Sequence, residues 1–177
     1  MVWPVRSTRE VYANPWIRVV EDVVERPDGS EGIYGLLEVR QPAVFVVAVT
    51  ADDRIVLVHV DRHTTGASWE LPAGGSDGED LRVAAERELA EETGYAAARW
   101  GHLGGQWGLN GVARSRIEVF LARDLTRLSE DLDEGEGIGA VEAFAWAEVK
   151  AMLRDGRLVD NESAGALLLA AIELGWA

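Results

Sequence analysis

The hydrophobic positions in the first third of the chain form short runs rich in β-branched residues. Two such runs, within residues 16–40, flank Pro27-Asp28-Gly29. Turn residues between two such runs are typical of a β-hairpin. Residues 43–60 form a buried-type apolar strand, a turn at Ala51–Arg54 and a second strand. The pattern therefore predicts β-structure up to residue 62, followed by a loop rich in Thr, Gly and Pro from about Arg62 to Gly78.

The period of the pattern changes between Asp80 and Thr93. The apolar positions that recur there at helical spacing are Leu81, Ala84, Ala85 and Leu89, and Gly94 provides the stop. Residues 99–107 and 116–125 then resemble strands on either side of a Gly-rich loop. An acidic loop at 129–140 leads to a short strand near Val141–Trp146 and to two helices at 147–156 and 161–174, the second capped by Asp160 or Asn161. This order predicts an α+β or layered α/β/α arrangement with a mixed sheet.

Composition narrows the class of protein. The 177 residues suit one domain, or a core domain with a small appendage, and 47% hydrophobic residues suit a globular core. No run approaches the roughly 20 apolar residues of a membrane span, and the N-terminus lacks the pattern of a secretion signal. With no cysteine in the chain, a cytoplasmic location is expected. The net charge of −14 argues against binding nucleic acid or an anionic membrane, but it leaves a small phosphorylated substrate open.

The helical segment carries an unusual concentration of glutamates in "AERELAEETGY", residues 85–95. At about 100° per residue, Glu88, Glu91 and Glu92 share one face, whereas Glu86 points away from Glu88. Clustered carboxylates are ligands that Mg²⁺ or Mn²⁺ prefers. The alternative is an acidic, solvated helix face. A buried opposite face and the Gly-rich "LPAGGSDGED" directly before the helix favour the metal site.

These residues resemble the signature box of the Nudix hydrolases, Gly-x5-Glu-x7-Arg-Glu-U-x-Glu-Glu-x-Gly-U, in which U is apolar. The second half of the box is matched by Arg87, Glu88, Leu89, Glu91, Glu92, Gly94 and Tyr95, and Glu79 lies at the expected distance before Arg87. The first half departs from it, because only four residues separate Gly74 from Glu79. Either the loop has lost one residue or Ala73 takes the glycine position.

The resemblance implies a Nudix-type sandwich in which Glu88, Glu91 and Glu92 hold Mg²⁺ or Mn²⁺. It places a further metal contact at the carbonyl of Ala73 or Gly74. It also implies that Arg87 pairs with Glu79, a supporting role.

Beyond the box, the chain is similar to the ADP-ribose pyrophosphatase branch. This implies a small N-terminal β-region at 1–41 that forms a homodimer, and a Nudix domain at 42–177. Arg62 falls where the branch often has an arginine near the substrate phosphates; the alternative is a surface ion pair. Glu70 is a candidate for touching an outer metal water. Trp69 and Trp107 are each assigned either to packing or to stacking on a base.

Two positions depart from the branch. Asn110 stands where it often has proline, and Ser115 where it commonly has glutamate.

The chemistry expected from this resemblance is metal-assisted hydrolysis of a nucleoside diphosphate derivative, with ADP-ribose as the leading substrate. Glu134 and Glu136 in the acidic loop are candidates for the general base, against the alternative of an acidic turn. GDP-mannose or another nucleoside diphosphate sugar, a dinucleoside polyphosphate and a damaged nucleoside triphosphate are alternative substrates. A nucleotide-sugar sensor without turnover is the alternative class, although the intact set of helical carboxylates favours an enzyme.

Overall fold

The computed structural model describes residues 3–129 and 137–176. The chain divides into two compact units, one formed by Met1–Pro42 with Trp107–Arg116 and the other by Ala43–Gln106 with Ile117–Ala177. This division falls after Pro42 and places residues 107–116 with the first unit. The boundary between an N-terminal region at 1–41 and a Nudix domain at 42–177 stays a prediction.

The N-terminal unit is built on three antiparallel strands, β1 (Val5–Ala13), β2 (Ile17–Glu25) and β3 (Glu31–Val39). The predicted hairpin at residues 27–29 joins β2 to β3, and there Asp28 Oδ1 accepts hydrogen bonds from the backbone and the hydroxyl of Ser30. Leu37 and Glu38 of β3 pair in parallel with residues 113–114, which explains why the distant segment joins this unit. The pattern did not single out β1, because all nine of its residues are exposed.

The second unit contains two sheets. The first has the order β8-β9-β4-β7 and the second β10-β5-β6. The strands are β4 (Ala43–Ala48), β5 (Arg54–Arg62), β6 (Gly66–Glu70), β7 (Ala73–Gly75), β8 (Tyr95–Gly108), β9 (Ala113–Arg127) and β10 (Ile138–Ala145), of which β8 and β9 also supply the segment of the N-terminal unit. Strands β4 and β9 run parallel whereas β4 and β7 are antiparallel, so the predicted mixed sheet is confirmed.

The expectation that residues 62–78 form a loop was wrong, because β6 and β7 lie within this segment. Both strands are short, and alternation over three to five residues is too brief to stand out among Thr, Gly and Pro. Strand β7 pairs with the first residues of β4. It therefore brings the Gly-rich segment onto the edge of the core sheet, directly before the glutamate-rich helix.

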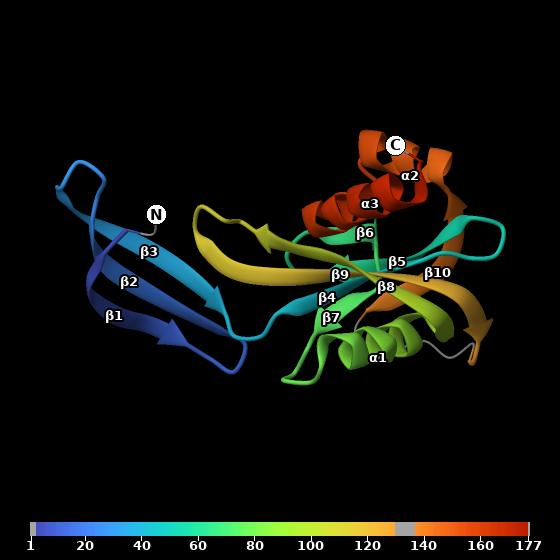
Figure 1. The fold of residues 1–177 in the computed structure, drawn as a ribbon, viewed down its shortest axis with the longest axis horizontal. Helices are drawn as coiled ribbons and strands as arrows, with labels where there is room; N and C mark the ends of the chain where they lie inside the picture. Colours follow the sequence, from blue (N-terminus) through green and yellow to red (C-terminus); the bar gives the residue numbers. More distant parts are fainter. Residues whose placement is uncertain (1–2, 130–136, 177) are drawn as a thin grey trace. The chain divides into compact units, whose positions relative to one another are not determined.

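The helices lie on opposite sides of the core sheet (Figure 1). Helix α1 (Leu81–Thr93) covers one side, and α2 (Trp146–Asp155) and α3 (Asn161–Leu174) lie on the other. Asp80 caps α1 by accepting hydrogen bonds from the second and third backbone N–H groups of the helix. Asp160, one of the two predicted candidates, caps α3 in the same way.

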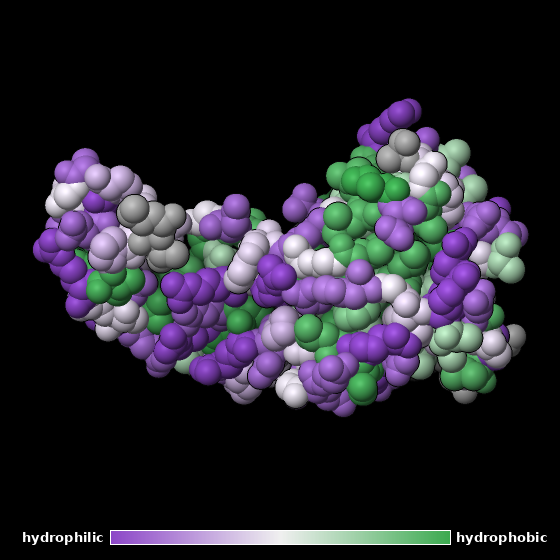
Figure 2. Space-filling model, viewed as in Figure 1, coloured by the Kyte–Doolittle hydropathy of each residue, from purple (hydrophilic) through white to green (hydrophobic). Residues whose placement is uncertain are grey.

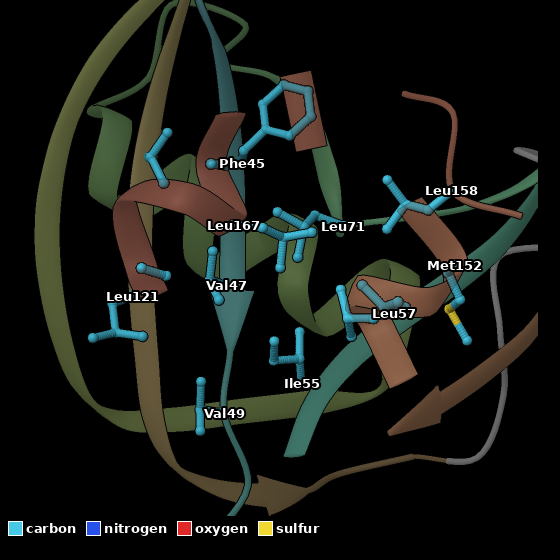
Figure 3. Close-up of a cluster of buried hydrophobic side chains, with 14 of the residues drawn as sticks. Phe45, Val47, Val49, Ile55, Leu57, Leu71, Leu121, Met152, Leu158 and Leu167 are labelled. Atoms are coloured by element: carbon cyan, nitrogen blue, oxygen red, sulfur yellow. The ribbon is translucent and has the colours of Figure 1, made fainter. Parts of the chain in front are cut away.

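The alternation of side chains along β4 divides the core into two layers. Val44, Val46 and Ala48 pack with Leu89 and the buried alanines of α1. Phe45, Val47 and Val49 point to the other side, where they form a cluster with Leu167 of α3, Met152 of α2 and residues of β5 (Figure 3). The predicted sandwich of helices around a mixed sheet is confirmed, and its two layers fix α1 against the edge formed by β7.

Helix α3 is apolar on more than its packed face. Leu168 and Ile172 are exposed, and Figure 2 shows apolar surface over this helix. Among the described helices, none, α3 included, is long and apolar enough to cross a membrane.

Candidate active site

The glutamates of α1 differ sharply in burial. Glu88 and Glu92 are 4% and 2% exposed, whereas the side chain of Glu91 is 53% exposed. Glu86 is exposed and forms an ion pair with Arg82 one turn earlier, as its position on the far side of the helix predicts. Two carboxylates are therefore buried toward β7, although burial of a charge is costly unless it is compensated.

Arg87 compensates one of these charges and joins the helix to the preceding loop. Its Nη1 donates to Glu88 Oε1 at 2.8 Å and to Glu91 Oε2 at 3.1 Å. Its Nε donates to Glu79 Oε2 at 3.1 Å, and its Nη2 to the Gly75 carbonyl at 2.9 Å. The pairing of Arg87 with Glu79 that the family resemblance implies is thus present. Burial would lower the pKa of Arg87, but hydrogen bonds to Glu79 and Glu91 and the charge of Glu88 raise it above its ordinary value.

Strand β7 holds the buried carboxylates from the other side. The backbone N–H of Ala73 donates to Glu92 Oε2 at 2.9 Å. Gly74 lies so close to Glu88 that a Cβ at this position would overlap the Glu88 carboxylate. A side chain at position 74 would therefore require the Glu88 carboxylate or β7 to shift, and Ala73 provides a backbone donor beside it.

The C-terminal end of α1 is fixed by Gly94, which adopts a left-handed conformation with φ of 69°. A Cβ there would overlap the carbonyl oxygen of Ser129 just after β9, and the Gly94 carbonyl accepts a hydrogen bond from the Leu128 backbone N–H at 2.7 Å. Glycine is required here both for the backbone conformation and for the close approach of β9.

The donor chemistry of this edge suits a hard divalent cation, because oxygens of Glu88, Glu91 and Glu92 lie on one side of α1 beside the backbone of β7. The carboxylates do not converge fully, however. Within the described part of the chain, no three His, Asp or Glu side chains form a group that could hold a metal ion. Arg87 holds Glu88 and Glu91, and the Ala73 N–H holds Glu92. Binding of a cation would therefore exchange these partners for the metal.

Arg62 at the end of β5 forms an ion pair with Glu70 of the neighbouring strand β6. Arg62 Nε and Nη2 donate to Glu70 Oε2 at 3.1 and 2.9 Å, and the Ser68 hydroxyl donates to Glu70 Oε1 at 3.0 Å. Glu70 is buried. Burial would lower the pKa of Arg62, but Glu70, and further away Glu92 and Asp160, raise it. Arg62 therefore forms an ion pair, and its place near the substrate phosphates stays a prediction.

The two tryptophans have different surroundings. Trp69 packs edge-on against His59 and Phe144 at the margin of the core, so the packing interpretation holds for it. Trp107 belongs to the N-terminal unit and is 55% exposed, so it is not a core residue. Arg116 lies over its ring with the guanidinium carbon 5.3 Å from the centroid.

Asn110 lies in the turn between β8 and β9 and Ser115 lies in β9, both within the part of this hairpin that belongs to the N-terminal unit. The two candidates for the general base, Glu134 and Glu136, lie outside the described residues.

Sequence reasoning missed the contribution of α3. The Ser163 hydroxyl, which is buried, accepts a hydrogen bond from the Leu71 backbone at 3.0 Å and so ties the start of α3 to the segment before β7. Glu162, half-buried beside it, has a raised pKa because of burial and the charge of Asp160. A serine and a glutamate in the first turn of a helix are common, so the sequence carries no signal for either role.

Comparisons with known proteins agree with this geometry. A family model for the NUDIX domain matches residues 39–164, and one for the nucleoside diphosphate sugar hydrolase N-terminal domain matches residues 3–37. The chain is 32% identical to a methanol dehydrogenase activator of Bacillus methanolicus, over 89% of this chain and 86% of the relative. It is 33% identical to an ADP-ribose pyrophosphatase of Bacillus subtilis (strain 168), over 77% and 75%.

A solved structure, that of an ADP compounds hydrolase, has the same fold with a TM-score of 0.85. It is 23% identical, and the match covers 99% of this chain and 95% of that one. The matched family model spans the sheets, α1 and the start of α3, which are the elements that assemble the buried glutamates. The chain therefore belongs to the Nudix family and is a Nudix-type pyrophosphohydrolase.

Proposed function

We propose that this protein hydrolyses the diphosphate bond of a nucleoside diphosphate derivative, with ADP-ribose as its preferred substrate and AMP and ribose 5-phosphate as products. The observation that carries the proposal is the pair of buried carboxylates, Glu88 and Glu92, held against the backbone of β7. Two buried acidic groups at a sheet edge suit a cation that binds phosphates, and they have no evident purpose in the packing of α1. The ADP-ribose pyrophosphatase of B. subtilis among the relatives supports the choice of substrate.

The residues proposed to hold Mg²⁺ or Mn²⁺ are Glu88, Glu91 and Glu92, with the carbonyl of Ala73. A divalent cation bound there would neutralise phosphate charge and lower the pKa of a water molecule bound to it. Arg87 keeps its contacts with Glu79 and the Gly75 carbonyl, so the loop before α1 stays in place when Glu88 changes partner.

Arg62 supports the proposal as a positive group beside acidic ones. The pair with Glu70 leaves the Nη1 group of Arg62 without a hydrogen bond among the described residues, and an N–H donor of this kind suits a phosphate oxygen. Glu70, anchored by Ser68, holds the guanidinium in a fixed orientation. Glu134 or Glu136 is proposed as the general base that takes the proton of the attacking water.

The second candidate substrate is a nucleoside diphosphate sugar such as GDP-mannose. The match of residues 3–37 to the nucleoside diphosphate sugar hydrolase N-terminal domain favours it specifically. In both substrates a diphosphate joins a ribonucleoside to a second sugar, so both would use the glutamates of α1 in the same way. They differ in the second sugar and in the base.

The function is tested by incubating the protein with a panel of nucleoside diphosphate derivatives and Mg²⁺ or Mn²⁺. A phosphatase added to the assay releases inorganic phosphate from the products, and this phosphate is measured. We expect turnover of ADP-ribose to exceed that of GDP-mannose by at least about tenfold in kcat/KM, since a site that hydrogen-bonds one base discriminates strongly against another. Faster turnover of GDP-mannose would replace ADP-ribose with the second candidate. Binding without turnover of every compound in the panel would support a sensor and contradict the proposed enzyme activity.

The N-terminal unit is proposed to form a homodimer. Strand β1 is exposed along its whole length and has a partner on only one side among the described strands, β2. Val11, Tyr12, Trp16 and Ile33 are exposed apolar residues of the same unit. An exposed edge strand with apolar side chains is a surface that a second chain can cover. We expect light scattering at micromolar concentration to give twice the 19.3 kDa mass of the chain, and a monomer mass would contradict the proposal.

A further inference from the structure

A cavity of about 450 Å³ opens in the N-terminal unit, and none of the glutamates of α1 lines it. This volume lies within the range of small-molecule sites, roughly 300–1,000 Å³. Aliphatic side chains of the three strands form most of the wall, together with the rings of Trp3 and Tyr34. The polar lining residues are Asp22, Asn110 and Arg114. A mostly apolar wall with a few convergent polar groups is typical of a ligand site.

Asp22 is the buried charge of this cavity. The residue is only 7% exposed and stands on β2. Its Oδ1 accepts a hydrogen bond from the Thr8 hydroxyl at 2.6 Å, which is the single hydrogen bond of this carboxylate among the described residues. A buried carboxylate is costly unless donors or a positive charge compensate it. The second oxygen therefore calls for a ligand that brings a cation or an N–H donor into the cavity.

The aromatic rings indicate the shape of that group. The ring centroids of Trp3 and Tyr34 lie 5.8 Å apart, and the ring planes meet at 89°. The Tyr34 hydroxyl donates to the Gly111 carbonyl, which fixes this ring. Two perpendicular rings form a corner rather than a slot between parallel faces. A corner suits a compact ammonium group, which ring faces attract, better than a flat nucleobase that stacks between parallel rings.

Arg114 adds an opposite charge to the lining. Its Nη1 donates to Glu38 Oε1 at 2.7 Å, and the side chain is more than half exposed. Asn110 is exposed as well, and its amide and the other N–H groups of Arg114 suit the oxygens of an anion. A buried negative charge and an exposed positive charge in one lining match a ligand that carries both signs.

We propose that this cavity binds a small zwitterion, with its ammonium group against Asp22, Trp3 and Tyr34 and its phosphate or carboxylate at Arg114 and Asn110. The ammonium group would contact the Asp22 carboxylate and the two aromatic rings, and the acidic group would accept charge-assisted hydrogen bonds from Arg114. The site is a binding site only, and no covalent step is involved. It is distinct from the hydrolytic site in residues and in ligand class.

The test is calorimetric titration of the full-length protein, without metal or nucleotide, using phosphocholine as the probe. We expect phosphocholine to bind with a dissociation constant below about 1 mM, and choline and inorganic phosphate each to bind at least about tenfold more weakly because each lacks one charge. Asp22→Asn keeps the shape of the side chain and the acceptor for Thr8. It should weaken phosphocholine binding by at least about tenfold, because the charge facing the ammonium group is lost.

Glu21→Gln is the matched control, because Glu21 precedes Asp22 on β2 and pairs with Arg9 instead. This variant should bind phosphocholine like the unchanged protein. Trp3→Ala, which removes one ring at an exposed position of the chain start, should also weaken binding. The proposal is overturned if phosphocholine shows no binding up to about 10 mM, or if Asp22→Asn binds it unchanged. Tighter binding of AMP that Asp22→Asn weakens would instead identify a nucleobase pocket.

Discussion

Glu92→Gln is expected to lower the rate of nucleoside diphosphate hydrolysis at least about a hundredfold, or roughly 2.7 kcal/mol in the activation free energy. The substitution removes the charge of the more deeply buried glutamate of α1. Its amide oxygen still accepts a hydrogen bond from the Ala73 backbone, as Glu92 Oε2 does at 2.9 Å. Packing is therefore retained while the proposed metal site loses one anionic ligand. Steady-state kinetics on ADP-ribose with Mg²⁺ and thermal unfolding by circular dichroism measure the two effects.

Glu86→Gln is the matched control, because it removes an equal charge from the exposed side of the same helix. Its activity should stay within about twofold of the unchanged protein, since an exposed ion pair contributes little. Titration with Mn²⁺ tests whether the position of the lost charge matters: Mn²⁺ binding should weaken in Glu92→Gln and persist in Glu86→Gln. Activity of Glu92→Gln within tenfold of the unchanged protein would contradict the assignment of Glu92 to the metal.

The helix that carries these glutamates was predictable from the sequence because its signals agree with one another. A helical period of apolar residues, an aspartate cap and a terminal glycine all mark residues 80–94, and the structure places α1 there. The face shared by Glu88 and Glu92 follows from helical geometry alone. Both side chains are buried toward β7, and their role as metal ligands stays a proposal.

The partners of these glutamates were not predictable in the same way. Helical spacing brings Glu91 close to Glu88, but the structure turns Glu91 toward solvent, where it shares Arg87 with Glu88. Which basic side chain pairs with a carboxylate depends on tertiary contacts, and the spacing of residues along a helix does not encode these contacts. The same reason explains Arg62, whose ion pair with Glu70 requires the β5–β6 pairing. The short strands β6 and β7 escaped prediction because long-range pairing with β5 and β4 stabilises them.

The departure of the box from the family spacing is resolved by local geometry. The sequence left open whether Gly74 or Ala73 takes the glycine position. The backbone at Gly74 lies against the Glu88 carboxylate, so a Cβ there would displace that carboxylate or β7, whereas Ala73 contributes its backbone N–H to Glu92. Gly74 thus serves as the close-approach glycine, and the shorter loop to Glu79 still allows Arg87 to reach both Glu79 and Gly75.

Gly74→Ala is therefore expected to lower hydrolytic activity at least about a hundredfold and to destabilise the fold by about 1–3 kcal/mol. A methyl group at this position overlaps the Glu88 carboxylate, so either Glu88 or β7 must move. Glu88 is buried, and its displacement also disturbs the hydrogen bond with Arg87. Chemical denaturation measures the loss of stability, and kinetics on ADP-ribose measure the loss of activity.

Gly75→Ala is the matched control, because a Cβ there meets its nearest neighbour, Asp77 Oδ1, at 3.4 Å, an ordinary contact. It should retain stability within about 0.5 kcal/mol. The cause is tested by repeating Gly74→Ala in a Glu88→Ala background, where the overlapping carboxylate is absent. If the clash explains the instability, Gly74→Ala should cost less than about 0.5 kcal/mol there, although both proteins remain inactive. An equal cost in both backgrounds would show that β7 requires glycine for a reason unrelated to Glu88.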